Sequence, residues 1–233
     1  MSEIPIEELM NILNKESNAI SPSRALGIEA IELYQELEVY YHSALDEVET
    51  KLFIIDRELS SNSHRGRKNS IHQIQKRIKR FKSVVNKLNR KQLDYSEQAI
   101  LANVRDFAGL RVICSYSDDI YTLINSLSHH PDITILTIKD YLKHPKPSGY
   151  RSVHVVLEVP VYFLEETKKI KVEIQFRTIA MDFWASLEHS LRYKNNLENP
   201  ELSGKLQGIS DDIEHLENEM LAIRKEIEGL SEE

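Results

Sequence analysis

The residues best suited to chemistry in this chain are a cluster of cations that no carboxylate interrupts. Eleven of the 30 lysine and arginine residues lie within residues 65–91, and no acidic residue occurs between Glu58 and Asp94. Because the net charge of the chain is −7, the remainder carries −18, and the positive charge is concentrated in one segment. Such a patch attracts phosphate groups and repels acidic protein surfaces. It predicts a site for a polyanion, with a nucleic-acid surface or a solvated helix face as alternatives.

The spacing within this segment favours a nucleoside triphosphate. We expect a helix through residues 77–87, which would place Arg80, Ser83 and Lys87 on neighbouring turns. Lys79 would then lie one turn before Ser83. Arginine binds phosphate with bidentate geometry and lysine acts as a compact point charge, so this combination suits a chain of phosphates.

Two carboxylates are predicted to lie beside the phosphate site. Asp106 directly precedes an expected strand, and Glu173 lies within another. Magnesium prefers a few carboxylate oxygens together with substrate phosphates, so this pair predicts a Mg²⁺ site. Considered singly, such an aspartate is more often a turn or helix cap, and such a glutamate a salt-bridge partner.

A cationic loop at residues 143–151 presents an aromatic ring. Two prolines restrict the loop backbone, Gly149 gives it conformational freedom, and Tyr150 follows between basic residues. An aromatic side chain in this setting can stack on a nucleobase while adjacent cations hold phosphate. An ordinary hairpin connection would explain Gly149 but not the crowding of cations.

The elements that must position these residues indicate an α+β fold with one sheet backed by helices. Short runs of period two predict four strands, at residues 110–116, 133–139, 152–159 and 171–177. Apolar residues at three- and four-residue steps predict helices at residues 25–59, 96–104, 119–128 and 178–194.

The two-residue period of a strand also indicates which side chains share each face of the sheet. In the last strand, Glu173 and Gln175 alternate with apolar neighbours and therefore share the polar face. If the apolar faces meet the helices, the polar faces of the strands line one cleft, although a merely solvated sheet face would show the same pattern. The residues expected to face this cleft are Arg111, Ser152, His154, Glu173, Gln175 and Arg177.

Length and composition predict one catalytic domain with helical extensions. The 233 residues are 41% hydrophobic and include no apolar run near the roughly 20 residues that span a bilayer. The acidic first residues do not resemble a signal peptide, and the single cysteine, Cys114, excludes an internal disulfide, so we expect a soluble, cytoplasmic protein without a membrane partner. The expected divisions are an arm at 1–24, a long helix at 25–60, the catalytic domain at 61–198 and a C-terminal helix at 199–233.

The C-terminal helix carries a heptad pattern typical of a coiled-coil seam. We therefore expect it to mediate homo-oligomerisation, while packing on its own domain is the alternative. The seam residues are Leu206, Ile209, Ile213, Leu216, Met220, Ile223, Ile227 and Leu230.

Five ordered motifs across residues 65–195 resemble the stand-alone small alarmone synthetases, which are single-domain relatives of the synthetase domain in the long stringent-response enzymes. The motifs are Arg77-x-Lys79-x₃-Ser83-x₃-Lys87, Asp106-Phe-Ala-Gly-Leu-Arg111, Ser148-Gly-Tyr-Arg-Ser-Val-His154, Glu173-Ile-Gln-Phe-Arg-Thr178 and Phe183-Trp-Ala-x₂-Glu-His-Ser190.

The resemblance implies a nucleotidyltransferase-like core that transfers the β,γ-pyrophosphoryl group of ATP to the ribose 3′-hydroxyl of GDP or GTP. For ATP it implies that Arg77 and Arg111 sandwich the adenine, while the phosphates are held by Lys79, Ser83, Lys87 and Arg90. It also implies that Asp106 and Glu173 bind Mg²⁺, and that Glu173 is placed to take the proton from the 3′-hydroxyl.

The acceptor site implied by the resemblance centres on Tyr150, which would stack on guanine. The other residues assigned to GDP or GTP are Lys143, Ser148, Arg151, His154 and Gln175. Small synthetases of this kind form homotetramers, which the heptad seam would serve.

Other activities are less consistent with the sequence. The long relatives hydrolyse alarmone at a metal site built around a His-Asp dipeptide, and none of the nine histidines precedes an aspartate, so we expect synthesis only. A nucleic-acid-binding or nucleotide-polymerising protein could use the same basic patch, but the acidic remainder of the chain disfavours it, and no nucleic acid is required. A regulatory module that has lost its chemistry would not need Asp106, Glu173 and Tyr150 together.

Overall fold

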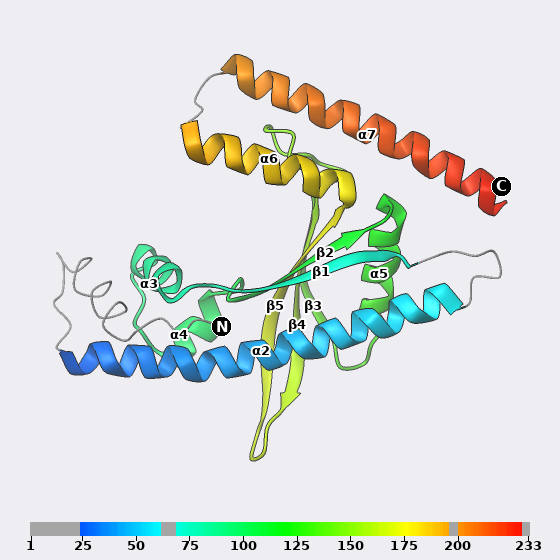
Figure 1. The fold of residues 1–233 in the computed structure, drawn as a ribbon. Coiled ribbons are helices and arrows are strands. Elements are labelled where there is room, and N and C mark those ends of the chain that lie inside the picture. The colour runs from blue at the N-terminus through cyan, green and yellow to red at the C-terminus, as the bar shows by residue number, and fades with distance from the viewer. Residues whose placement is uncertain (1–23, 62–68, 196–199, 230–233) are drawn as a thin grey trace.

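A mixed five-stranded sheet forms the centre of the molecule (Figure 1), in a computed structural model that describes residues 24–61, 69–195 and 200–229. The strands are β1 (Ile71–Ile78), β2 (Ala108–Cys114), β3 (Thr134–Asp140), β4 (Val153–Tyr162) and β5 (Thr167–Thr178). The helices are α2 (Arg24–Ser61), α3 (Phe81–Arg90), α4 (Glu97–Asn103), α5 (Ser117–Ser128), α6 (Ile179–Asn195) and α7 (Pro200–Glu228). This arrangement confirms the predicted α+β class.

The central strand β5 brings the predicted site residues into register. It pairs in parallel with β2 and antiparallel with β4, in the sheet order β1-β2-β5-β4-β3. Gln175 lies opposite Arg111 on β2 and opposite His154 on β4, and Glu173 projects from the same face two residues away. The alternate residues of β5 are completely buried, which confirms the assignment of faces: Val172, Ile174 and Phe176.

The long helix α2 packs across the apolar side of the sheet and closes the core (Figure 1). The Tyr41 ring stacks on Phe107 with centroids 4.1 Å apart and an interplanar angle of 13°. Because Phe107 follows Asp106, this contact fixes the backbone beside a predicted site carboxylate. The completely buried residues along α2 are Leu37, Tyr41, Ala44, Leu45, Val48 and Leu52.

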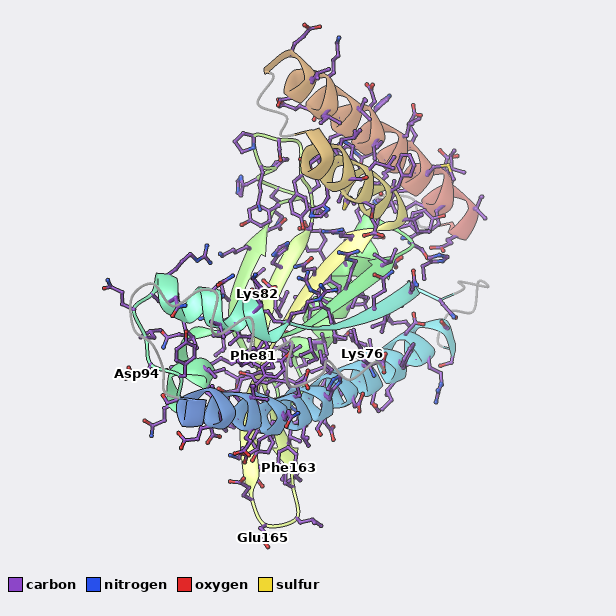
Figure 2. The ribbon with its side chains drawn as sticks, turned by 60° about the vertical axis from the view of Figure 1, so that its left-hand side comes forward. Lys76, Phe81, Lys82, Asp94, Phe163 and Glu165 are labelled. Atoms are coloured by element: carbon purple, nitrogen blue, oxygen red, sulfur yellow. The ribbon has the colours of Figure 1, made fainter. Side chains whose placement is uncertain are left out.

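Helix α3 is amphipathic, with a buried apolar face and a polar face that is at least partly exposed. Phe81 and Lys82 begin the helix (Figure 2), and Phe81 is buried in an edge-on contact with Tyr34, whereas Lys82 is exposed. Val84, Val85 and Leu88 complete the buried face. Ser83 and Lys87 therefore share the partly exposed side of α3, one turn apart as predicted.

The helix through Ser83 was predicted correctly, but its expected extension back to residue 77 and the expectation of only four strands were wrong. Residues 71–78 form a fifth, edge strand, and the helix begins only at Phe81, so Arg77 lies in β1 and Lys79 in the connection. Ile71 and Ile74 are three residues apart, which resembles helical spacing. In the structure, Ile71 pairs with Cys114 and Gln73 with Ile113, and this β-bulge at residue 72 produces the same spacing in a strand.

The other predicted elements match the structure within a few residues. Helices α2, α4, α5 and α6 and strands β2 to β5 occupy the expected segments. Helix α7 runs alongside α6 on the far side of the sheet from α2 (Figure 1). The predicted arm at 1–24 lies outside the described residues except for Arg24, and so does the last seam residue, Leu230.

Candidate nucleotide-binding site

A cavity of about 360 Å³ opens on the polar face of β1, β2 and β5. It lies at the sheet edge nearest α3, and its lining includes both predicted carboxylates together with several cations. These lining residues are Gln75, Lys76, Arg77, Lys79, Asp106, Gly109, Leu110, Arg111, Glu173 and Gln175. The sheet therefore gathers in one place six of the residues predicted for ATP, metal or acceptor binding.

Asp106 is held between two ammonium groups. Its Oδ2 accepts a hydrogen bond from Lys79 Nζ at 2.9 Å, and its Oδ1 accepts one from Lys87 Nζ at 2.6 Å. Burial alone would raise the pKa of Asp106, but the hydrogen bonds from Lys87 and Lys79 outweigh it and hold the pKa below its ordinary value. Asp106 is therefore a charged carboxylate whose oxygens are both engaged by cations.

Glu173 lines the cavity and contacts His154, the hydrogen-bond partner of Tyr150. Its Oε1 lies 3.6 Å from His154 Nδ1, and Gln175 Nε2 donates to Oε2 at 3.5 Å. The contact with His154 lowers the pKa of Glu173, and burial opposes that shift only in part. The side chain is thus an ionised carboxylate and a weak proton acceptor.

The Tyr150 ring lies among cations. Lys146 Nζ is 4.8 Å and Arg177 Cζ is 5.2 Å from the ring centroid. The Tyr150 hydroxyl shares a 2.9 Å hydrogen bond with His154 Nε2 and accepts one from Arg177 at 3.0 Å. Because His154 contacts Glu173 through its other nitrogen, a continuous polar chain joins Tyr150 to the cavity.

Asp182, at the start of α6, connects the two arginines of the site and was missed by the sequence analysis. Its Oδ1 accepts a hydrogen bond from buried Arg177 at 2.8 Å and lies 3.5 Å from Arg111 Nη1. Arg177 was expected to face the cleft but received no role. The available signal was the spacing, because Asp182 comes five residues after Arg177, where the strand passes into the first helical turn.

Comparison with known proteins assigns the chain to a family. Residues 76–198 match the family described as "Region found in RelA / SpoT proteins". The chain is 43% identical over 190 residues to the GTP pyrophosphokinase YwaC of Bacillus subtilis, covering 81% of this chain and 89% of that protein. The chain belongs to the small alarmone synthetases of the RelA/SpoT family.

Solved structures agree with that assignment. Small alarmone synthetase 2 from Bacillus subtilis superposes with a TM-score of 0.73 at 41% identity, covering 83% of this chain and 98% of that one. Small alarmone synthetase 1 from the same organism, bound to its product pppGpp, gives a TM-score of 0.71 at 35% identity, covering 83% and 97%. In the described part of this synthetase, no helix is long and apolar enough to cross a membrane.

The remaining predicted residues of the synthetase lie around the cavity or outside it. Ser83 lies on α3 near Lys87, whereas Arg90 is exposed at the end of that helix. Lys143 is exposed and pairs with Asp140 at 3.8 Å, and Ser148 lies in the loop before Tyr150. Arg151 is buried and directed toward α7 rather than toward the cavity.

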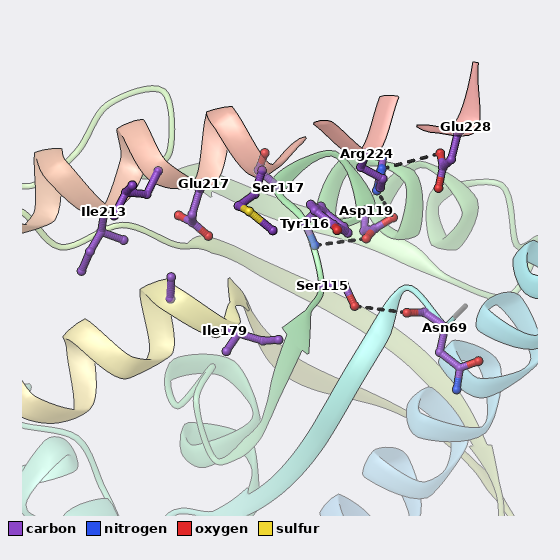
Figure 3. A pocket seen from close by; sticks show the side chains of 13 residues that line it. Asn69, Ser115, Tyr116, Ser117, Asp119, Ile179, Ile213, Glu217, Arg224 and Glu228 are labelled. Carbon is purple, nitrogen blue, oxygen red and sulfur yellow. Dashed lines mark hydrogen bonds and ion pairs between the residues drawn. The ribbon is translucent and has the colours of Figure 1, made fainter. Parts of the chain in front are cut away.

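A larger hollow of about 750 Å³ lies between α7 and the ends of β2, α5 and α6 (Figure 3). Its lining is mostly apolar, and its only cation among the described residues is Arg224, which pairs with Asp118 and Asp119. Leu216 and Met220 of α7 line the hollow yet remain more than half exposed. This composition does not suit a triphosphate, so the smaller, basic cavity is the candidate nucleotide site.

Proposed function

We propose that this synthetase is a GTP pyrophosphokinase that transfers the β,γ-pyrophosphoryl group of ATP to the 3′-hydroxyl of GDP or GTP and releases AMP. The observation that carries the proposal is the polar face of β5, where Glu173 lies between the Lys79–Asp106–Lys87 cluster and the His154–Tyr150 pair. The functions named for YwaC and for the pppGpp-bound synthetase 1 support it.

The adenine of ATP would lie between Arg77 and Arg111. Arg77 pairs with Gly109, two residues before Arg111, so the two arginines are diagonal neighbours on one face of the sheet. The Cα atoms of such diagonal neighbours lie roughly 7–8 Å apart. A planar ring between two guanidinium planes needs about 7 Å, twice a contact distance of ~3.5 Å. The register of β1 and β2 therefore suits a base held between the two arginines.

The triphosphate would bind the ammonium groups of Lys79 and Lys87, which now donate hydrogen bonds to Asp106. Lys79 and Lys87 converge on that carboxylate from different elements, and phosphate oxygens offer them equivalent charge-assisted hydrogen bonds. Release of the lysines would free the oxygens of Asp106. The same contacts thus keep both cations positioned before the nucleotide binds.

We propose that Asp106 and Glu173 hold a magnesium ion in this cavity. The residues fit such an ion, since both carboxylates are charged and line the same cavity. Two carboxylates plus substrate phosphates are the ligand set that magnesium prefers. When bound, the ion would neutralise charge on the transferring phosphates.

The acceptor nucleotide would bind with its guanine on Tyr150 and its 3′-hydroxyl toward Glu173. The lowered pKa makes Glu173 a weak general base, so its main contribution would be to accept a hydrogen bond from that hydroxyl and orient it. His154 would keep Tyr150 and Glu173 in a fixed relation, because it contacts both.

We further propose that the enzyme is a cytoplasmic homo-oligomer, most simply a tetramer. Helix α7 docks on its own domain through Leu206, Ser210, Ile213 and Arg224, and the seam residues Leu216 and Met220 border the hollow on the same side. Apart from Leu206 and Ile213, the seam residues that the structure describes are 49–81% exposed: Ile209, Leu216, Met220, Ile223 and Ile227. An apolar row of this extent suits a second copy of the chain.

The activity is tested by incubating the protein with ATP, Mg²⁺ and GDP and separating the products by ion-exchange chromatography. The proposal requires stoichiometric AMP and a guanosine nucleotide with two additional phosphates. Formation of ADP, or consumption of ATP without a new guanosine nucleotide, would refute it.

A further inference from the structure

Helix α7 holds the residues on both sides of Tyr150. On one side, the buried Ser210 hydroxyl donates a 2.5 Å hydrogen bond to the carbonyl oxygen of Gly149. On the other, buried Arg151 donates to Glu214 at 2.7 Å and to Asp211 at 3.0 Å. Tyr150, whose side chain contacts His154 and Arg177, thus lies between two residues that are anchored to α7.

The loop backbone also packs directly against the helix. Gly149 has φ = 88°, and a Cβ atom added there would lie 2.9 Å from Ser210 Cβ and 3.1 Å from Gln207 Cα. Trp184 of α6 donates from Nε1 to the Leu206 carbonyl oxygen at 3.0 Å, which fixes α7 to α6 beside this contact. The loop therefore rests on a fixed surface rather than on a side chain that can move aside.

The ion pairs of Arg151 with Asp211 and Glu214 leave its guanidinium little access to a ligand. Asp211 and Glu214 are three residues apart on α7, so both carboxylates meet the guanidinium from one face of the helix. The Arg151 side chain is only 9% exposed. The guanidinium is buried although Asp211 and Glu214 are 56% and 44% exposed, and loss of both carboxylates would leave its charge without either of these partners. This arrangement is therefore a structural clamp rather than an open anion site.

We infer that α7 is a positioning element for the acceptor nucleotide, and that Arg151 acts through α7 to place Tyr150 instead of contacting substrate. The inference rests on the proposed stacking of guanine on Tyr150. Since the RelA/SpoT match covers residues 76–198, the clamp joins the family region to a helix outside it. The expected effect is specific to the acceptor, because the anchored loop contributes no residue to the lining of the ATP cavity.

The test is the double substitution Asp211→Asn with Glu214→Gln, which removes both charges with little change in shape. The KM for GDP should rise about three- to tenfold, in line with the ordering cost of one or two side chains. The KM for ATP should change less than twofold. The matched control is Asp212→Asn with Glu219→Gln, two exposed carboxylates of the same helix, which should leave both constants unchanged.

The direction of the change in KM for GDP distinguishes a positioning role of Arg151 from direct contact with the acceptor nucleotide. If Arg151 bound the acceptor phosphates, removal of its two partners would release it, and the KM for GDP would stay constant or fall. Either outcome, or an equal rise in both KM values, would overturn the inference.

A second measurement does not depend on activity. Amide hydrogen exchange of residues 141–152, without nucleotide, should be faster in the double variant than in the control. Unchanged exchange would also overturn the clamp, whereas absence of alarmone synthesis in the wild-type enzyme would refute only the proposed function. If the double variant loses its cooperative thermal transition, Ser210→Ala, which removes a single hydroxyl, replaces it with the same expected division of KM values.

Discussion

At the scale of single residues, the site is defined by charges that satisfy one another before substrate arrives. Asp106 is shared by two lysines, and Glu173 is paired with His154 and Gln175. Both carboxylates have a pKa below the ordinary value, so neither takes up a proton near neutral pH. A nucleotide with its metal would replace these internal contacts rather than fill an uncharged space.

Removing either carboxylate charge should abolish synthesis. Asp106→Asn and Glu173→Gln each keep the shape of the side chain but remove a proposed metal ligand, and turnover should fall at least about 100-fold, or ~2.7 kcal/mol in barrier. Asp94→Asn, in an exposed loop, is the control for substitution and handling. Retention of more than about a tenth of wild-type turnover, less than ~1.4 kcal/mol, would contradict the proposed role of that carboxylate.

Removing the Tyr150 ring should weaken the acceptor and spare ATP. Tyr150→Ala should reduce the affinity for GDP by roughly 1–3 kcal/mol, the usual contribution of one base stack. Tyr162→Ala, at a side chain that is 74% exposed, should have no effect on either nucleotide. The check is calorimetric titration of both variants with GDP and with a non-hydrolysable ATP analogue. A loss confined to the ATP analogue would invert the placement of the two substrates.

The lowered pKa of Asp106 predicts a pH-dependent stability. Ionised Asp106 stabilises the folded state above the unfolded-state pKa of about 3.9, and this contribution is lost as the pH falls through the lower folded-state pKa. The difference in unfolding free energy between wild type and Asp106→Asn, measured in urea, should therefore be fully present at pH 7 and begin to shrink below about pH 4. An equal difference at pH 7 and pH 3 would show that the charge does not stabilise the fold.

At the scale of elements, the sequence predicted the central strands well because their apolar faces are regular. Val172, Ile174 and Phe176 alternate strictly with Glu173 and Gln175, and this alternation was enough to assign the polar face of β5. Of the six residues expected to face the cleft, Arg111, Glu173 and Gln175 line the cavity, whereas Ser152 and Arg177 are buried. The edge strand β1 was not recognised, because its bulge at residue 72 gives Ile71 and Ile74 the spacing of a helix.

Contacts between distant elements were the other part that the sequence could not supply. Lys79 and Lys87 were expected to converge through one helix, but Asp106 brings them together from a connection and from α3. Arg151 resembled a substrate ligand because a basic residue next to Tyr150 in a cationic loop suggests phosphate. Its partners lie 60 and 63 residues away on α7, and no local pattern indicates them.

The close approach of the loop to α7 predicts opposite effects for two glycine substitutions. Gly149→Ala should lower stability by at least about 1 kcal/mol, because φ is positive and the added methyl group meets the α7 backbone. Gly204→Ala, in α7 with no atom within 4 Å of the added Cβ, should instead raise stability by up to about 1 kcal/mol. Thermal unfolding of both variants gives the comparison. A neutral Gly149→Ala would mean that the loop can leave the helix at little cost.

At the scale of the whole molecule, the acidic remainder of the chain leaves one basic site exposed to anionic nucleotides. Because the net charge is −7, long-range attraction alone does not favour polyanions, and the local cations of β1 and α3 must supply it. Six of the exposed large apolar residues lie on α7, which contributes no residue to the lining of the nucleotide cavity: Leu202, Ile209, Leu216, Met220, Ile223 and Ile227. The proposed self-association would thus use a surface other than the nucleotide cavity.

Charges placed in the exposed seam should dissociate the oligomer without unfolding the subunit. Ile223→Asp with Ile227→Asp changes two seam residues that are 50% and 81% exposed in the single chain. Light scattering should show the mass of a smaller species, while thermal unfolding stays cooperative. Ala222→Asp, an exposed neighbour outside the seam, should leave the mass unchanged. A wild-type protein that is itself monomeric, or a double variant of wild-type mass, would contradict the assignment of this surface.

In the proposed reaction, the bond between the α- and β-phosphates of ATP is broken and both outer phosphates are transferred together to the 3′-hydroxyl of a guanosine nucleotide. The most direct measurement follows ATP labelled separately at the α- and β-phosphates during reaction with GDP. The β label should appear in the guanosine product and the α label in AMP. A β label in ADP would indicate a simple kinase, and an α label in polymer with β label in free pyrophosphate would indicate a nucleotidyl transferase; either result would contradict the account.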